Sequence, residues 1–335
     1  MYLKPKIGVV VIVVSAVVGG LFGLTVVSDF PIWLNGLTGI GVGVVVSSLF
    51  ILFEAYLVPR HLDKRFSTWP FAAVLGLRTS YYTATSVLAL WFVPSMFAGE
   101  YVSILRAGLV RELLFTVGVA AAFNLIVEFS RLIGPRTLLN IVSGRYHRPQ
   151  IEDRAVLFLD LVGSTRLAEE VGPTRFHSIL NAVFVHLGAV LGEHKGEIYR
   201  YVGDEIIATW PVRGDESLSV ALAAATKCLA ALETEGPRFE RSFGMTPRVR
   251  ASLHVGPLLT GELGGFKKEI AFLGDVMNTT ARLQEACRDQ GKALVVSKAV
   301  LDRAEIPPGW YAETLGPVPL RGRSEPVSLT ALSRR

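Results

Sequence analysis

Residues 7–27 form an apolar run of membrane-crossing length that contains no charged side chain. About 20 helical residues are enough to cross the hydrocarbon core of a bilayer, which is roughly 30 Å thick. The run is too long and too rich in Gly and Val for an ordinary signal peptide, and no small-residue cleavage site followed by a mature domain is evident. It therefore predicts a helix that crosses a membrane, and this determines how the first part of the chain folds.

Three more apolar runs follow, at residues 33–57, 80–97 and 113–129. The connection between the first two runs, residues 28–31, is short enough to make them a tight hairpin. Together the four runs predict an α-helical membrane domain with four spans over residues 1–130, embedded in a lipid bilayer.

Lysine and arginine residues gather on one side of these four predicted helices. Cytoplasmic loops of membrane proteins carry an excess of such residues. The loop between the first two helices has none, and the loop between the last two has Arg106 and, at its edge, Arg111. We therefore expect a multi-pass protein of the cell (inner) membrane, with both termini and the second half of the chain in the cytoplasm. The residues that decide this orientation are Lys4, Lys6, Arg60, Lys64, Arg65, Arg78, Arg131 and Arg136.

Glu54, Arg111 and Glu128 are charged residues inside these apolar runs or at their edges. Their side chains can extend to the membrane surface, where the charge stays in water. They can instead form a polar contact inside the membrane that transmits a signal or binds a ligand. The sequence leaves both interpretations open. The second interpretation includes the possibility of an unknown membrane ligand.

Composition agrees with this division and excludes other classes of protein. The chain has 335 residues, is 50% hydrophobic and has a mean hydropathy of +0.43, an excess that lies in its first part. The net charge of +5 comes largely from short segments beside the apolar runs, and no arginine run with interleaved aromatic residues indicates nucleic-acid binding. Cys228 and Cys287 are the only cysteines, so neither a disulfide framework nor a zinc site is expected.

The second half begins with a connector, residues 131–150, and continues as one domain over residues 151–335. A strand, a helical stretch and a hairpin open this domain, which predicts a ferredoxin-like α+β core. We expect strands at 155–161, 197–202, 205–210, 247–254, 257–262, 269–273, 293–296, 310–314 and 326–332, and helices up to about 193, over 217–232 and around Asn278.

Two aspartates, Asp160 and Asp204, end apolar strand-like runs of this domain. Carboxylates at such positions suit a hard cation such as Mg²⁺, which prefers oxygen ligands and usually keeps substrate phosphates as partners. Asn278 and Arg282 lie four residues apart in a predicted helix and therefore face the same side. Each residue alone is ordinary turn or helix chemistry, but together they indicate phosphoryl or nucleotidyl transfer.

Four segments, in this order, resemble the catalytic domain of class III adenylate and guanylate cyclases. They are FLDLVGST at 158–165, YVGD at 201–204, RASLHVG at 250–256 and LGDVMNTTAR at 273–282. They cover most of the second half of the chain. Four ordered segments are a far more specific signal than the Gly-Asp pair alone, and the apolar runs before them indicate the membrane-anchored bacterial type.

The resemblance implies two metal ions, Mg²⁺ or Mn²⁺, in each active site, at Asp160, Leu161 and Asp204. One ion would activate the ribose 3′-hydroxyl and the other would hold the triphosphate. Class III sites are shared, with the metal ligands from one subunit and the Asn/Arg helix from the other. Since this chain carries both sets, the resemblance implies a homodimer with two sites.

The resemblance also implies roles toward the substrate. Asn278 would orient the ribose, and Arg282 would stabilise the charge that grows on the transferred phosphoryl group. Arg250 and Arg321 would contact phosphates, because they match phosphate-binding positions of the family.

The base-selecting positions depart from the family pattern. The family places a lysine four residues before the second metal aspartate, where this chain has Arg200, and an aspartate or threonine where it has Ala271. Arginine can donate to a purine nitrogen, but alanine cannot accept from an exocyclic amine. Backbone groups, or a neighbour such as Glu269, could supply the acceptor.

These features predict a membrane-anchored adenylate cyclase that converts ATP to 3′,5′-cyclic AMP and pyrophosphate. A guanylate cyclase of the same fold and a catalytically silent receptor that binds nucleotide are the alternatives. A diguanylate cyclase shares a motif like the one at residues 202–206, but residues 160–165 and the helix with Asn278 and Arg282 argue against it.

Overall fold

The computed structural model of the chain describes residues 5–25, 31–62, 69–98, 109–266, 268–318 and 327–334. The chain divides into two compact units, an N-terminal unit of Met1–Ile133 and a C-terminal unit of Gly134–Arg335. Several residues that carry predictions lie outside the described ranges: Lys4, Lys64, Arg65, Arg106 and Arg321.

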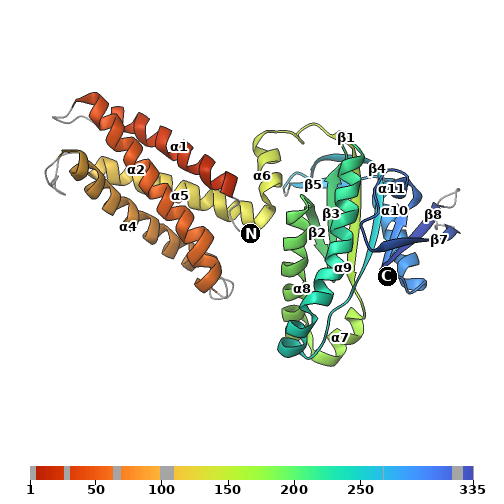
Figure 1. Ribbon diagram of the computed structural model, residues 1–335. Coiled ribbons are helices and arrows are strands. Elements are labelled where there is room, and N and C mark those ends of the chain that lie inside the picture. The colour runs from red at the N-terminus through yellow and green to blue at the C-terminus, as the bar shows by residue number, and fades with distance from the viewer. Residues whose placement is uncertain are drawn as a thin grey trace. The chain divides into compact units, whose positions relative to one another are not determined.

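The N-terminal unit is a set of long apolar helices (Figure 1). In the described residues they are α1 (Pro5–Leu24), α2 (Ile32–Leu52) with its π-helical continuation η1 (Phe53–Leu62), α4 (Phe71–Ala98) and α5 (Leu109–Ile133). Each predicted span coincides with one of them, although α4 begins well before residue 80. Many of their valine and leucine side chains are exposed, as on Val13 and Leu21 of α1.

Helices α1 and α2 pack with their backbones in contact, which only glycine permits. A Cβ atom added to Gly39 would lie 2.1 Å from the carbonyl oxygen of Gly19, and one added to Gly19 would lie 2.3 Å from that of Gly39. Contacts this short leave no space for a side chain, and small residues at helix interfaces allow such close approach in membranes.

Length and composition alone make three of the described helices able to cross a membrane: Ile32–Val58, Pro173–Glu193 and Asp215–Phe243. Only the first belongs to the N-terminal unit, where Gly8–Leu24 and Val117–Ser130 are shorter apolar helices. The other two lie in the C-terminal unit and pack on its sheet. The four helices are therefore found, and the four-span membrane crossing stays a prediction.

The C-terminal unit has the alternating strands and helices of an α+β domain. The described residues form an eight-stranded sheet of order β2-β3-β1-β4-β6-β8-β7, with β5 paired to β4. Among the described strands, only the β4–β6 pair is parallel. The elements are α6 (Pro135–Val142), β1 (Gln150–Leu161), α7 (Ser164–Val171), α8 (Pro173–Glu193), β2 (Glu197–Val202), β3 (Glu205–Pro211), α9 (Asp215–Phe243), β4 (Val249–Leu263), β5 (Glu269–Leu273), α10 (Asp275–Asp289), β6 (Leu294–Ser297), α11 (Lys298–Leu301), β7 (Trp310–Val318) and β8 (Val327–Arg334).

Helices cover both faces of this sheet (Figure 1). Alternate side chains of β1 point to opposite faces. Leu157 packs with Leu187 of α8 and Leu222 of α9, whereas Phe158 packs with Val276 of α10 on the other face. The predicted α+β arrangement is confirmed.

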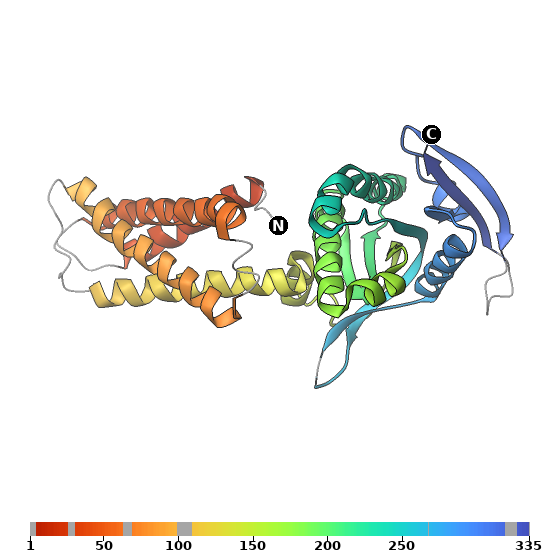
Figure 2. The same cartoon turned by 90° about the horizontal axis from the view of Figure 1, so that it is seen from below.

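Two expected boundaries are wrong. The strands expected at 247–254 and 257–262 are one strand, β4, because its pairing with β1 continues in register through Gly256 and Pro257. Figure 2 shows β4 and β5 as a hairpin that extends away from the rest of the unit. Helix α9 runs to Phe243 instead of ending near 232, because Gly236 and Phe239 continue its buried face past the internal Pro237.

Candidate active site

Three neighbouring strands place Asp160 among charged residues. In the antiparallel register Asp160 on β1 lies opposite Glu205 on β3 and opposite Arg250 on β4. Directly opposite side chains lie on the same face of a sheet, so Glu205, Asp160 and Arg250 form a cross-strand row. The row lies on the face that α10 covers, since Phe158, two residues earlier, packs against Val276 there.

Asp204 reaches the same place from the tight turn between β2 and β3. Gly203 begins this turn with a φ of 60°, a conformation that glycine adopts without steric cost. The carbonyl oxygen of Asp204 accepts a hydrogen bond from the backbone N–H of Leu161, at 3.3 Å. The turn is thereby attached to the end of β1, which brings the two predicted metal ligands together.

Asp160 lies in surroundings that favour its neutral, protonated form. Burial raises the pKa of Asp160 to about 6, with further contributions from a hydrogen bond with the Asp204 carboxyl group and from its charge. Arg250, whose Nη1 lies 3.8 Å from Asp160 Oδ2, lowers this pKa in part, and so does the charge of Arg288. Burial also raises the pKa of Glu205 to about 7, followed by the charges of Asp160 and Asp204.

This donor set fits a hard divalent cation. Two carboxylates that repel each other gain most from a cation placed between them. The Leu161 side chain is buried in the core on the opposite sheet face, so only its main chain could be a ligand. No group of three or more His, Cys, Asp or Glu within the described ranges is arranged to hold a metal ion. The remaining ligands would then be water and substrate phosphate, as Mg²⁺ prefers.

Asn278 and Arg282 lie on the outward side of α10. Asn278 is exposed and Arg282 is half-buried, whereas Thr280 and Leu283 on the other side of the helix are fully buried against the sheet. In the part of the chain that the structure describes, no hydrogen bond or ion pair joins Asn278 or Arg282 to either aspartate. The predicted site residues therefore form two separate sets within one chain.

Glu205 and Arg288 are charged residues that the sequence reasoning missed at the aspartate pair. The signal for Glu205 was its position directly after Asp204, at the start of a strand whose register the sequence does not reveal. Arg288 lies in the last turn of α10, six residues after Arg282. Its effect on Asp160 follows from the path of α10, which carries Gln284 to the carbonyl oxygen of Arg250, at 3.3 Å.

One of the two residues at the base-selecting positions, Arg200, is held by an ion pair with Glu269. Arg200 Nη2 donates to Glu269 Oε2 at 2.9 Å, and the Arg200 guanidinium lies 5.2 Å from the ring centre of Tyr199. Tyr199 in turn stacks on Phe272, with ring centres 4.3 Å apart. Ala271 is buried and offers no acceptor. The expected neighbour Glu269 is therefore beside Arg200, although 69 positions separate them.

Residues 146–330 match the adenylate and guanylate cyclase catalytic domain, more than half of the chain. The chain belongs to the adenylate and guanylate cyclase family. Adenylate cyclase 2 of Rhizobium meliloti (strain 1021) is 30% identical to it over 317 residues, which cover 89% of this chain and 84% of that protein. The adenylate cyclase of Anabaena cylindrica is 24% identical over 60% of this chain and 40% of its own length.

Solved structures show the same fold. A bacterial light-regulated adenylyl cyclase has a TM-score of 0.59 at 16% identity, over 70% of this chain and 68% of that one. The adenylyl cyclase CyaB from P. aeruginosa has a TM-score of 0.50 at 17% identity, over 56% of this chain and 97% of that one. The resemblance seen in the four sequence segments is confirmed at the level of the family.

The N-terminal unit of this cyclase contains a buried ion-pair cluster. Arg78 of α4 is fully buried; its Nε lies 3.5 Å from Glu54 Oε1, and its Nη1 donates to Glu128 of α5. Tyr82 also donates to Glu54. Arg78 therefore does not lie in a loop, as the orientation argument assumed, and Glu54 makes a polar contact within the unit. The side chain of Arg111 lies outside the described side chains.

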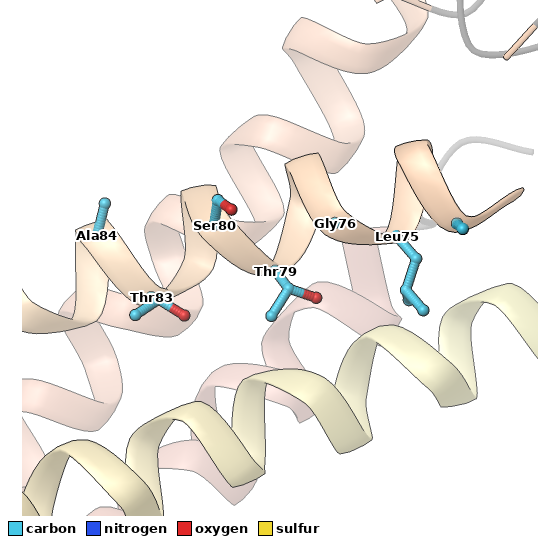
Figure 3. Close-up of a pocket in the computed structure, with 7 residues that line it drawn as sticks. Leu75, Gly76, Thr79, Ser80, Thr83 and Ala84 are labelled. Carbon is cyan, nitrogen blue, oxygen red and sulfur yellow. The ribbon is translucent and has the colours of Figure 1, made fainter. Parts of the chain in front are cut away.

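A groove of about 680 Å³ follows α4 of the cyclase, lined by small and hydroxyl-bearing residues from Ala72 to Ala84. Figure 3 shows Leu75, Thr79 and Thr83 on the side that faces α5, and Ser80 and Ala84 on the other side. Asn124 of α5 donates to Thr79 Oγ1 at 3.1 Å. The membrane ligand stays a prediction, and this groove is a surface at which it can be tested.

Proposed function

We propose that the chain is a membrane-anchored adenylate cyclase that forms 3′,5′-cyclic AMP and pyrophosphate from ATP at sites shared between the two subunits of a homodimer. The observation that carries this proposal is the separation of the two residue sets. Asp160 and Asp204 meet at the end of β1, while Asn278 and Arg282 face outward from α10. In a symmetric dimer each set can meet the other set of the second copy.

The residues divide the chemistry between them. The 3′-oxygen of the ribose attacks the α-phosphorus, the bond to the β-phosphate oxygen breaks, and the hydroxyl proton leaves with water. Two Mg²⁺ or Mn²⁺ ions, held by Asp160, Asp204 and the main chain of Leu161, would lower the pKa of the 3′-hydroxyl and offset the triphosphate charge. Asn278 orients the ribose. Arg282 stabilises the negative charge that grows during transfer.

Arginine supplies the remaining contacts to the triphosphate. Arg250 borders the aspartate pair on β4 and is positioned to bind a phosphate that the cation also holds. Arg321 is proposed for the same role from its sequence position alone. An attacking hydroxyl that is already part of the substrate needs positioning more than covalent help, so no nucleophilic Ser or Cys is required.

ATP is the proposed substrate because two relatives, Adenylate cyclase 2 of Rhizobium meliloti and the adenylate cyclase of Anabaena cylindrica, are named as adenylate cyclases. The Arg200–Glu269 pair supports purine binding, since the guanidinium donates to a ring nitrogen and the carboxylate accepts from an amine. Guanine also presents N–H groups to a carboxylate and an oxygen to arginine. This pair therefore favours a guanylate cyclase as the second candidate function.

The helices of the N-terminal unit are proposed to cross the cell (inner) membrane four times, with both termini in the cytoplasm. Their exposed valine and leucine side chains would face lipid, while Arg78 pairs with both Glu54 and Glu128 inside the unit. Charged residues within membrane segments usually face the interior of the helix bundle and pair there.

Product analysis tests the proposal directly. The full-length protein, purified in detergent, is incubated with Mn²⁺ and either ATP or GTP, and the products are identified by mass spectrometry. Cyclic AMP from ATP is the expected result. Cyclic GMP from GTP alone would support the second candidate, and nucleotide binding without any product would refute both in favour of a silent receptor.

A further inference from the structure

The carboxylate of Glu205 has no function in the site as described so far. It is half-buried on the first residue of β3, directly opposite Asp160 and next to Asp204. Within the described ranges it has no hydrogen-bond or ion-pair partner, whereas Asp160 has Arg250 on its other side. Like charges directly opposite each other destabilise a sheet, so this arrangement needs a compensating positive charge.

Among the residues that the structure describes, the cations near the row do not supply this charge at Glu205. Arg250 lies across Asp160, on the far side of the row, and Arg288 belongs to the last turn of α10. A divalent cation between Asp160 and Asp204 would lie beside a third carboxylate, that of Glu205, which is opposite Asp160 and next to Asp204. Outer carboxylates of this kind orient the water and the ligands of a bound metal, and their loss typically costs 10–100-fold in affinity.

We infer that Glu205 is a positioning residue of the cation site, which strengthens Mg²⁺ or Mn²⁺ binding by orienting a water that the cation holds. This inference rests on the proposed function, because it places the cation at Asp160 and Asp204. Without metal, Glu205 adds to the repulsion within the row and destabilises the protein. With metal, the same charge contributes to binding.

The test compares Glu205→Gln, which keeps the shape and removes the charge, with the full-length wild-type protein. Mn²⁺ alone is titrated and the free ion is measured by electron paramagnetic resonance. We expect Glu205→Gln to weaken Mn²⁺ binding about tenfold. Glu205→Asp, which keeps the charge, should bind within a few-fold of wild type. The matched control is Glu193→Gln, an exposed carboxylate at the end of α8.

Thermal unfolding of the same variants separates a role at the cation from a purely structural one. In EDTA we expect Glu205→Gln to unfold at a higher temperature than wild type, because repulsion is removed. A structural role would instead lower the unfolding temperature with and without metal. Unchanged Mn²⁺ affinity of Glu205→Gln would overturn the inference.

Asp160→Asn, measured in parallel, separates failure of the Glu205 inference from failure of the proposed cation site. If Asp160→Asn loses Mn²⁺ binding and Glu205→Gln does not, the inference fails and the proposed cation site stands. If wild type and Asp160→Asn bind Mn²⁺ equally, the proposed site itself is refuted, and the role of Glu205 with it.

Discussion

Mixing two inactive variants should restore activity if the two residue sets work across a dimer. Asp160→Ala removes a proposed metal ligand, and Arg282→Ala removes the guanidinium proposed to stabilise the transition state. Each variant alone should be inactive, because in its homodimer both sites lack the same residue. In a heterodimer one site lacks both residues, while the other takes Asp160 from one chain and Arg282 from the other and is complete.

The expected recovery follows from counting. Random assembly of equal amounts makes about half of the dimers heterodimers, and each has one complete site of two, so the mixture should reach about one quarter of wild-type activity. Co-expression with two different affinity tags, followed by tandem purification, isolates the heterodimer, which should reach about one half. Cyclic AMP formed per unit of protein is the measurement.

A heterodimer that is proven by both tags and remains inactive would refute the sharing of sites. So would full activity of either variant alone, which would remove that residue from the mechanism. Arg282→Lys provides the matched control for folding, because it keeps a positive charge on the same outward face of α10 and cannot form the planar fork of arginine.

Three further predictions follow from particular contacts. Burial and Asp204 raise the pKa of Asp160 from 3.8 to about 6, so the stability contributed by its protonation in EDTA should be complete below pH 4 and lost as the pH rises through 6. Thermal unfolding against pH should show a smaller dependence in Asp160→Asn than in wild type, with the part that remains in the variant coming from Glu205, whose pKa is raised to about 7. Mn²⁺ should conversely bind more weakly below pH 6. Gly39→Ala should destabilise the N-terminal unit by about 1–3 kcal/mol, since its Cβ would overlap the backbone of α1. Gly76→Ala, whose Cβ would have nothing within 4 Å, should leave the stability unchanged. Thermal unfolding of both variants in detergent is the measurement. Glu269→Ala should lower kcat/KM for the preferred nucleotide by roughly tenfold or more, as the acceptor for the base is lost, while unchanged kinetics would exclude the Arg200–Glu269 pair from base recognition.

Local chemistry made part of the fold predictable from the sequence. The hairpin around Gly203 was predicted almost to the residue, because two apolar strands flank a turn that needs glycine. Strand β5 and the helix with Asn278 were likewise found where alternation and spacing indicated them. These elements position the two predicted sets of site residues.

The errors arose where a residue's environment depends on distant parts of the chain. Arg78 was assigned to a loop because the third span was expected to begin at residue 80, yet Glu54 and Glu128, which lie on other helices, pair with it inside the unit. The position of Glu205 opposite Asp160 was missed because cross-strand register is set by the whole sheet. A single sequence does not reveal partners at such distances.

The separation of the two sets has a consequence for control of the enzyme. If the sites are shared across a homodimer as proposed, a single chain that carries Asp160, Asp204, Asn278 and Arg282 in two separate sets is incomplete as a catalyst. Activity then depends on how two copies are held together, since a displacement of about 1 Å at a reacting centre can cost about 100-fold in rate. Because the N-terminal unit precedes each C-terminal unit in the same chain, association of the apolar helices would raise the effective concentration of the two catalytic surfaces. The apolar helices can therefore influence catalysis through dimer geometry without contributing a residue to the site.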